Sequence, residues 1–221
     1  MAKAFIFDLD NTLIDFMRMK RLSCEAAMDA MISAGLEIDR KNGMDILFRL
    51  YFEHGLEYQR IFQAFMRKVL GRIDYGIMAC GIVAYRRVKE GMLYSYPNVS
   101  STLRELKKGH RLVILSDAPR IQAWIRLASM GLQDVFDHVI TFDDTKQKKP
   151  SAKPFMLALR KLRLKPDECV MVGDSLKRDI APAKKLGFRT VFARYGGNNE
   201  PVRVKPDYAI DDIKELLEIE F

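Results

Sequence analysis

The sequence has few cysteines and no long apolar segment. Its three cysteines, Cys24, Cys80 and Cys169, have no metal-site spacing and form no even set for disulfides, which indicates a reducing compartment. The most apolar stretch, residues 75–85, is too short to span a bilayer. The apolar run at the N-terminus meets charged residues too soon for a signal peptide. These absences predict a cytoplasmic protein.

Internal repeats and low-complexity segments are also absent, and the composition is that of an ordinary globular chain. Of the 221 residues, 48% are hydrophobic and 30% are charged, with a formal net charge of +8. Such a charge can attract nucleic acid or an anionic substrate. The basic residues are spread along the chain, and the densest stretch, 146–165, is typical of a solvated helix face. We therefore expect neither a nucleic-acid partner nor a membrane partner, and no feature indicates an oligomeric state.

From about residue 97 onward, helical patterns alternate with short, nearly continuous apolar strands. The predicted strands are 111–116, 138–142, 169–174, 189–193 and 207–210, and the predicted helices are 98–110, 119–131, 152–163, 178–187 and 211–220. Asn98 is a typical N-cap and Gly109 a typical helix terminator. Alternation of this kind predicts a parallel sheet covered by helices on both faces.

Residues 16–92 have a different texture, with four helical patterns that contain no proline. They cover residues 21–35, 43–52, 58–71 and 77–91 and fit a small antiparallel bundle. The strand predicted at 4–9 must still join the later sheet. We therefore predict a Rossmann-like parallel-sheet α/β core formed by residues 1–15 and 93–221, with residues 16–92 inserted as an all-α cap domain. Such an insert can act as a lid, because open parallel sheets bind ligands at the carboxyl ends of their strands.

Two carboxylates interrupt the end of the first predicted strand. Asp8 and Asp10 follow the apolar residues 5–7, although burying a charge is costly unless it is paired or binds a metal. Later strand ends, and a loop before a helix, carry further polar groups: Ser116, Asp117, Lys149, Asp174, Ser175 and Asp179. Each alone is common in turns, caps or solvated surfaces. Because the carboxyl ends of parallel strands share one edge, the set together predicts a functional site.

The residue types at this edge predict a site for Mg²⁺ and a phosphoryl group. Asp8, Asp10 and Asp174 would repel one another, and hard oxygen ligands without a nearby His or Cys favour Mg²⁺. Positive charge and hydrogen-bond donors are also present: Lys149, Thr12 and Ser116. Phosphoryl transfer depends on positioning and on electrostatic stabilisation. One aspartate can attack phosphorus to form an acyl phosphate, and a second can protonate the leaving oxygen and then activate water.

Four segments, in this order, resemble the motifs of the haloacid dehalogenase-like (HAD) hydrolase superfamily. They are "DLDNT" (8–12), "LSD" (115–117), "KKPSAKPF" (148–155) and "GDSLKRD" (173–179). The similarity runs from residue 4 to about residue 195. The helical insertion between the first two motifs resembles the α-helical cap of phosphoglycolate phosphatase-like members. The resemblance implies a Rossmann-like core, a helical cap and a phosphatase activity.

The resemblance also implies a role for each motif residue. Asp8 would be the nucleophile and Asp10 the general acid/base. Lys149 would act in catalysis by offsetting the charge of the nucleophile and the phosphate. The residues that would bind the substrate are Thr12, Ser116, Asp117 and Lys149. The residues that would hold Mg²⁺ are Asp8, Asp10 through its backbone carbonyl, Asp174 and, in support, Asp179. Asp117 departs from the family pattern, which often has Asn or Gly there, and adds a negative charge beside the phosphate.

Asp10 separates the subclasses of the superfamily. The dehalogenases usually lack an aspartate two residues after the nucleophile, because an ester to carbon needs no leaving-group acid, so Asp10 favours a phosphatase. A phosphomutase shares the same residues, and a non-enzymatic, receiver-like phosphate-binding module also places aspartates at a sheet edge. We expect a Mg²⁺-dependent phosphatase that hydrolyses a small phosphorylated metabolite through an aspartyl-phosphate intermediate.

Overall fold

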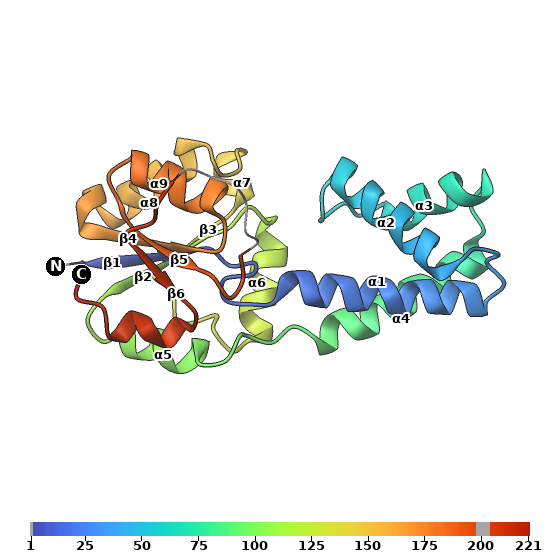
Figure 1. Cartoon of the computed structure of the whole chain (residues 1–221), viewed down its shortest axis with the longest axis horizontal. Helices are drawn as coiled ribbons and strands as arrows, with labels where there is room; N and C mark the ends of the chain where they lie inside the picture. The colour runs from blue at the N-terminus through green and yellow to red at the C-terminus, as the bar shows by residue number, and fades with distance from the viewer. Residues whose placement is uncertain (1, 198–203) are drawn as a thin grey trace. The chain divides into compact units, whose positions relative to one another are not determined.

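The chain divides into two compact units. A computed structural model describes residues 2–197 and 204–221. One unit comprises Met1–Asp15 together with Tyr94–Phe221, and the other is Phe16–Leu93. The first unit contains a parallel sheet and its covering helices, and the second contains helices (Figure 1). The sheet unit carries all of the motif residues identified above.

The sheet of the first unit is parallel. Within the described residues it has six strands in the order β3-β2-β1-β4-β5-β6, and each pair of neighbours is parallel. The strands are β1 (Ala4–Phe7), β2 (Arg111–Leu115), β3 (His138–Ile140), β4 (Cys169–Gly173), β5 (Arg189–Ala193) and β6 (Tyr208–Ile210). The strand order reverses direction between β1 and β4, where open parallel sheets bind their ligands. The predicted parallel-sheet α/β core is confirmed.

Side chains of the strands alternate between two apolar cores. In β1, Phe5 and Phe7 belong to one core, and Ala4 and Ile6 belong to the other. The helices of the first core are α5 (Val99–Leu106), α6 (Arg120–Ser129) and η3 (Ile213–Leu217), and those of the second are α8 (Ala152–Leu162) and α9 (Ala181–Lys185). Successive strand residues point to opposite faces, which explains why the strands are apolar throughout. Figure 1 shows helices on both faces of the sheet, as the sequence predicted.

The strand predicted at 138–142 is shorter than expected. It ends at Ile140 because Thr141 begins a short helix, α7 (Phe142–Thr145). The backbone N–H and the hydroxyl of Thr141 each donate a hydrogen bond to the Asp144 carboxylate at 2.8 Å. This reciprocal capping satisfies backbone groups at the start of the helix, so the local hydrogen bonds outweigh the β-propensity of the segment.

Two predicted helices also differ from the structure. The helix predicted at 178–187 is preceded by a π-helical turn, η2 (Leu176–Ile180), and continues as α9. The Ser175 hydroxyl caps this turn by accepting a hydrogen bond from the Arg178 N–H at 3.2 Å. The helix predicted at 211–220 is limited to the short 3₁₀ helix η3. The π-helical turn matters for function because it carries Asp179.

The second unit is built from four helices within the described residues. They are α1 (Phe16–Ser33), α2 (Arg40–His54), α3 (Ile61–Leu70) and α4 (Tyr75–Gly91). Its buried core includes Met28, Met31, Phe62 and Phe65. Helices α1 and α4 pack closely, because a Cβ on Gly81 would lie 2.6 Å from the Met31 side chain. Within residues 2–197 and 204–221, no helix combines the length and the hydropathy that a membrane span requires.

A buried lysine connects the elements of this helical unit. The Lys20 ammonium donates hydrogen bonds to the Leu56 carbonyl and to the Tyr85 hydroxyl, each at 2.8 Å. It also lies 4.4 Å from the centre of the Tyr51 ring. Lys20 is only 4% exposed, and such contacts compensate for the cost of removing its charge from water. Lys20 therefore stabilises the packing of α1 against α2 and α4.

Candidate active site

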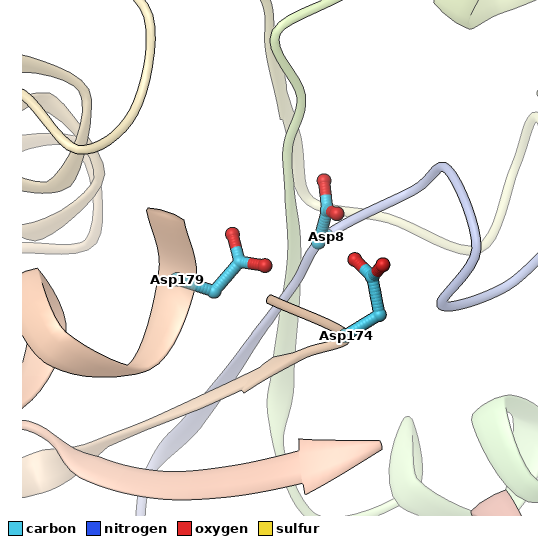
Figure 2. A group of neighbouring side chains, drawn as sticks. All are labelled: Asp8, Asp174 and Asp179. Atoms are coloured by element: carbon cyan, nitrogen blue, oxygen red, sulfur yellow. The ribbon is translucent and has the colours of Figure 1, made fainter. Parts of the chain in front are cut away.

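Three aspartates converge at the carboxyl edge of the sheet. Asp8 follows β1, Asp174 follows the neighbouring strand β4, and Asp179 lies in η2. Their closest oxygens all lie within 4.8 Å of one another, and all three residues are buried. Figure 2 shows the three carboxylates facing a common centre. The group lies at the point where the strand order reverses, which is the expected ligand-binding position.

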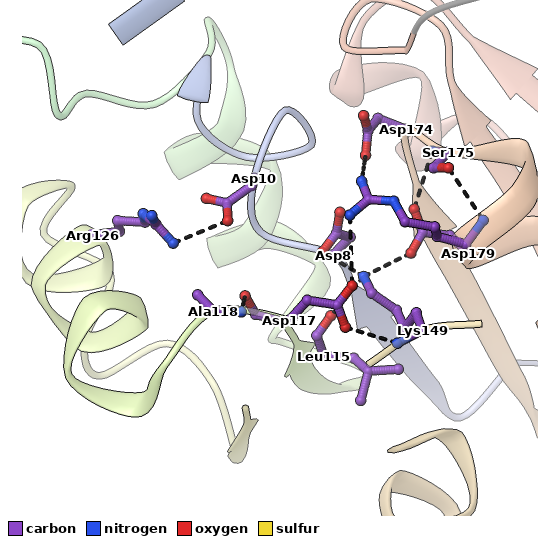
Figure 3. Close-up of polar contacts among 12 residues, drawn as sticks. Asp8, Asp10, Leu115, Asp117, Ala118, Arg126, Lys149, Asp174, Ser175 and Asp179 are labelled. Atoms are coloured by element: carbon purple, nitrogen blue, oxygen red, sulfur yellow. Dashed lines mark hydrogen bonds and ion pairs between the residues drawn. The ribbon is translucent and has the colours of Figure 1, made fainter. Parts of the chain in front are cut away.

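Lys149 lies against this group of carboxylates. Its Nζ is 2.6 Å from Asp8 Oδ1 and 2.7 Å from Asp179 Oδ1, and it donates a hydrogen bond to the Leu115 carbonyl at 3.0 Å (Figure 3). The Lys149 side chain is 1% exposed. Charge-assisted hydrogen bonds of this kind are strong in a low-dielectric interior. Lys149 is thus fixed beside the predicted nucleophile.

Asp117 holds the loop that carries Lys149. Its Oδ1 accepts a hydrogen bond from the Lys149 backbone N–H at 2.9 Å, as Figure 3 shows. The peptide bond between Lys149 and Pro150 is cis. The sequence did not explain why Asp117 stands where the family often has Asn or Gly. In the structure, the Asp117 carboxylate anchors the loop that carries Lys149. Its predicted contact with substrate stays a prediction.

The electrostatic environment differs between Asp8 and Asp174. Burial would raise the pKa of Asp8, but the positive charges of Lys149 and Arg178 outweigh it and hold that pKa below its ordinary value. Burial, with the negative charges of Asp8 and Asp179, raises the pKa of Asp174 to about 9. Burial opposes the charge of Lys149, yet the carboxylates of Asp179 and Asp8 outweigh it and raise the pKa of Lys149. Asp8 is therefore ionised at neutral pH, as a nucleophile must be.

Arg178 is a second cation at this edge, and the motif comparison did not single it out. Its Nη1 is 3.6 Å from Asp117 Oδ2, and its Nη2 is 4.0 Å from Asp174 Oδ1. The carboxyl groups of Asp8, Asp117, Asp174 and Asp179 thus face the cations Lys149 and Arg178. The crowding of acidic groups, which raises the pKa of Asp174, and ligand atoms that are all oxygen fit Mg²⁺ well.

The predicted hydroxyl donors are buried near the same strand ends. Ser116 follows β2, and its Oγ accepts a hydrogen bond from the Ala118 N–H at 3.1 Å. Thr12 is fully buried, and among the described residues its hydroxyl has no hydrogen-bond partner. A buried hydroxyl of this kind is costly without a partner, so a ligand oxygen would suit it. The Ser175 N–H donates to Asp179 Oδ2 at 3.1 Å and helps to orient that carboxylate.

Asp10 lies apart from the three-carboxylate group. Its Oδ2 accepts a hydrogen bond from Arg126 Nη1 at 3.0 Å. Figure 3 shows the Asp10 carboxylate turned toward Arg126, while Asp8 lies beside Lys149. The predicted metal contact of Asp10 is through its backbone carbonyl and stays a prediction. Arg126 was missed by the motif comparison, but it occupies the apolar face of its helix with Ala123 and Leu127, where a charged residue is unusual.

A glycine outside the motifs lies against the first motif. Gly196 follows β5, and a Cβ added to it would overlap the carbonyl oxygen of Asn11. Asn11 has a positive φ of 61° and stands between Asp10 and Thr12 in the sequence. Only a residue without a side chain permits this close approach. The backbone at Gly196 therefore helps to define the position of the loop that carries the predicted catalytic residues.

The substitution Gly196→Ala is expected to displace the Asp10–Thr12 loop and to lower kcat/KM by on the order of a hundredfold, the cost of misplacing reacting groups by about 1 Å. Steady-state kinetics measures this loss, and circular dichroism confirms that the variant is folded. Gly109→Ala is the matched control, because a Cβ there would lie more than 4 Å from every heavy atom of the described residues other than Gly109 and its chain neighbours. Unchanged kinetics in Gly196→Ala would show that the close approach is not needed for activity.

Comparisons with known proteins agree with this geometry. A family model described as haloacid dehalogenase-like hydrolase matches residues 2–187. Glyceraldehyde 3-phosphate phosphatase from Methanocaldococcus jannaschii is 36% identical and covers 99% of this chain and 97% of its own length. Phosphoglycolate phosphatase from Pseudomonas putida is 29% identical, with coverages of 98% and 79%. The crystal structure of a HAD phosphatase from Thermococcus onnurineus superposes with a TM-score of 0.72 at 28% identity, covering 98% of this chain and 96% of that one.

The chain belongs to the haloacid dehalogenase-like hydrolase family. Within that family it is an enzyme of the phosphatase branch, because relatives with 33–36% identity over nearly the whole chain are phosphatases. The resemblance inferred from the four motifs is thereby confirmed. The roles of the individual site residues remain predictions.

Proposed function

We propose that this enzyme is a Mg²⁺-dependent phosphatase that hydrolyses small phosphorylated metabolites through an aspartyl-phosphate on Asp8. The observation that carries the proposal is the ionised, buried Asp8 carboxylate, which lies 2.6 Å from Lys149 and beside Asp174 and Asp179. A carboxylate in this environment can attack phosphorus while the neighbouring cation offsets the charge of the phosphoryl group.

The reaction has two steps, and atoms and charges balance in each. In the first, an Asp8 oxygen forms a bond to phosphorus, the bond from phosphorus to the ester oxygen breaks, and Asp10 gives its proton to that leaving oxygen. In the second, Asp10 takes a proton from water, the water oxygen bonds to phosphorus, and the bond from phosphorus to Asp8 breaks. Asp8 is regenerated, and orthophosphate and an alcohol are released.

Asp8, Asp174 and Asp179 are the residues whose carboxylates would hold Mg²⁺. When bound, this ion would supply positive charge that stabilises the phosphoryl oxygens. The Lys149 ammonium, which forms ion pairs with Asp8 and Asp179, would add to this positive charge. The Thr12 hydroxyl, which has no hydrogen-bond partner within the described part of the chain, and the Ser116 side chain would donate hydrogen bonds to the phosphoryl group.

A triose phosphate is the first substrate class to test. The 36% identical relative from M. jannaschii is a glyceraldehyde 3-phosphate phosphatase, and more distant relatives act on phosphoglycolate. The Asp8 side chain is only 5% exposed, so phosphorus must reach a recessed carboxylate. A small ester meets this requirement more easily than a phosphate on a folded protein surface.

Orthophosphate release from a panel of phosphate esters tests the proposal. We expect kcat/KM for glyceraldehyde 3-phosphate or another three-carbon ester to exceed that for phosphopeptides and terminal oligonucleotide phosphates by about a hundredfold, the discrimination that contacts within one site typically provide. Comparable hydrolysis of a folded phosphoprotein would contradict the small-substrate class. Isomerisation of a sugar phosphate without orthophosphate release would indicate a phosphomutase. Halide release from a haloacid would indicate a dehalogenase. Stable phosphorylation without turnover would indicate a receiver-like module.

A further inference from the structure

Arg126 is a fully buried charge in the sheet unit. It is 1% exposed and lies in α6, on the helix face whose neighbours Ala123 and Leu127 are also buried. A guanidinium in such a position is strongly unfavourable unless an anion compensates for the lost hydration. Asp10 provides such an anion, because its Oδ2 is 3.0 Å from Arg126 Nη1. An apolar residue would fill this helix position at a lower cost, so packing alone does not explain the arginine. We therefore look for its role in function.

The two aspartates of the first motif have separate cationic partners. Asp8 pairs with Lys149 at 2.6 Å, and Asp10 pairs with Arg126 at 3.0 Å. Figure 3 shows these two pairs on either side of the loop. The loop backbone is itself fixed, because the Asn11 N–H donates to the Ile14 carbonyl at 2.7 Å. With the backbone held, the contact to Arg126 helps to orient the Asp10 carboxylate.

We propose that Arg126 is a positioning residue that presents Oδ1 of Asp10 for proton exchange with the leaving oxygen and with water. The inference rests on the general acid/base role of Asp10 in the proposed function. Oδ2 can accept the Arg126 hydrogen bond both as a carboxylate oxygen and as the carbonyl oxygen of the protonated acid. The bond therefore persists through the cycle and directs the proton to Oδ1. Arg126 itself touches neither substrate nor phosphorus.

A positioning role predicts a dependence on the leaving group that a packing role does not. An alkyl phosphate has a poor leaving group, and its cleavage needs the proton from Asp10. The nitrophenolate of p-nitrophenyl phosphate is stable as an anion and needs little protonation. Because kcat/KM reports on the steps through the first irreversible bond cleavage, the two substrates compare the acid step directly.

The experiment measures kcat/KM for glyceraldehyde 3-phosphate and p-nitrophenyl phosphate in the Mg²⁺-loaded enzyme and its variants. Arg126→Met keeps the side-chain bulk but removes the donor. We expect it to lose about a hundredfold on the alkyl ester and no more than about fivefold on the aryl ester, within the range of general acid catalysis. Arg126→Lys retains a charged donor and is expected to show the same preference to a smaller extent. Arg160→Met, an exposed arginine on α8, is the control and should change neither rate.

Asp10→Asn separates failure of this inference from failure of the proposed function. If Asp10→Asn shows no leaving-group preference, the acid role of Asp10 is wrong, and the inference falls with it. A second outcome is that Asp10→Asn loses more kcat/KM on the alkyl ester than on the aryl ester, whereas the Arg126 variants lose equally on both esters or gain on the alkyl ester. In that case only the positioning role of Arg126 is overturned. In the double variant that combines Asp10→Asn with Arg126→Met, kcat/KM for the alkyl ester should fall by less than the product of the two single losses. The reason is that both residues act on the same proton transfer. Should Arg126→Met fail to fold, the same comparison in Arg126→Lys decides.

Discussion

Asp8→Asn is expected to lower kcat/KM by on the order of 10⁴-fold or more, the loss seen when members of a covalent catalytic unit are removed. The amide that replaces the carboxylate cannot accept a phosphoryl group to form an acyl phosphate. Rapid quenching with labelled substrate should therefore trap a hydroxylamine-sensitive phosphoenzyme in the wild type and none in the variant. The substitution keeps the size of the side chain, so the effect is chemical rather than steric.

Two controls make this result specific to Asp8. Asp45→Asn removes an exposed carboxylate from α2 and should leave kinetics and phosphoenzyme unchanged. Thermal unfolding of Asp8→Asn checks that the variant is folded. We expect it to fold, because the ion pair of Lys149 with Asp179, at 2.7 Å, does not involve Asp8. A folded Asp8→Asn enzyme that still forms a covalent adduct would assign the nucleophile to another residue.

Removal of divalent metal is expected to abolish hydrolysis, and added Mg²⁺ to restore it. The acidic groups of Asp8, Asp174 and Asp179 repel one another even with Lys149 beside Asp8 and Asp179, and their oxygens suit Mg²⁺. Ca²⁺ should inhibit the enzyme, because its larger coordination shell would misplace the nucleophile. Assays in excess EDTA, followed by titration with each ion, measure these effects. Full hydrolysis in excess EDTA would contradict the metal requirement.

Thermal unfolding provides a readout of the metal that does not depend on turnover. A ligand that binds only the folded state stabilises it by about 2.7 kcal/mol at a hundredfold excess over Kd, so Mg²⁺ should raise the Tm. Asp174→Asn should lose most of this rise, whereas Asp45→Asn should keep it. An equal Mg²⁺-dependent rise in Asp174→Asn would place the bound ion elsewhere.

Much of the fold follows from local patterns in the sequence. Apolar strands alternating with helices predicted a parallel sheet with two covered faces, because each strand must bury both of its sides. The sheet places the ends of β1 and β4 side by side, which is why Asp8 and Asp174, far apart in the sequence, come together. The family also followed from the motifs, because the order and spacing of four polar segments are properties of the sequence alone.

Other features depend on contacts that spacing does not encode. The strand predicted at 138–142 gave way to a helix at Phe142 because Thr141 and Asp144 cap it, and such reciprocal hydrogen bonds depend on exact geometry. The overlap that a side chain on Gly196 would make with Asn11 joins segments that are remote in the chain.

The sequence by itself determined the family, the parallel core and the set of polar residues at the sheet edge. Only the tertiary structure decided how these residues pair. It assigned Lys149 to Asp8, Arg126 to Asp10, and the Asp117 carboxylate to the Lys149 backbone. The physical reason is that periodicity and motif order report on local conformation. The partner of a buried charge depends instead on which opposite charge the folded chain brings close enough to offset the cost of removing that charge from water.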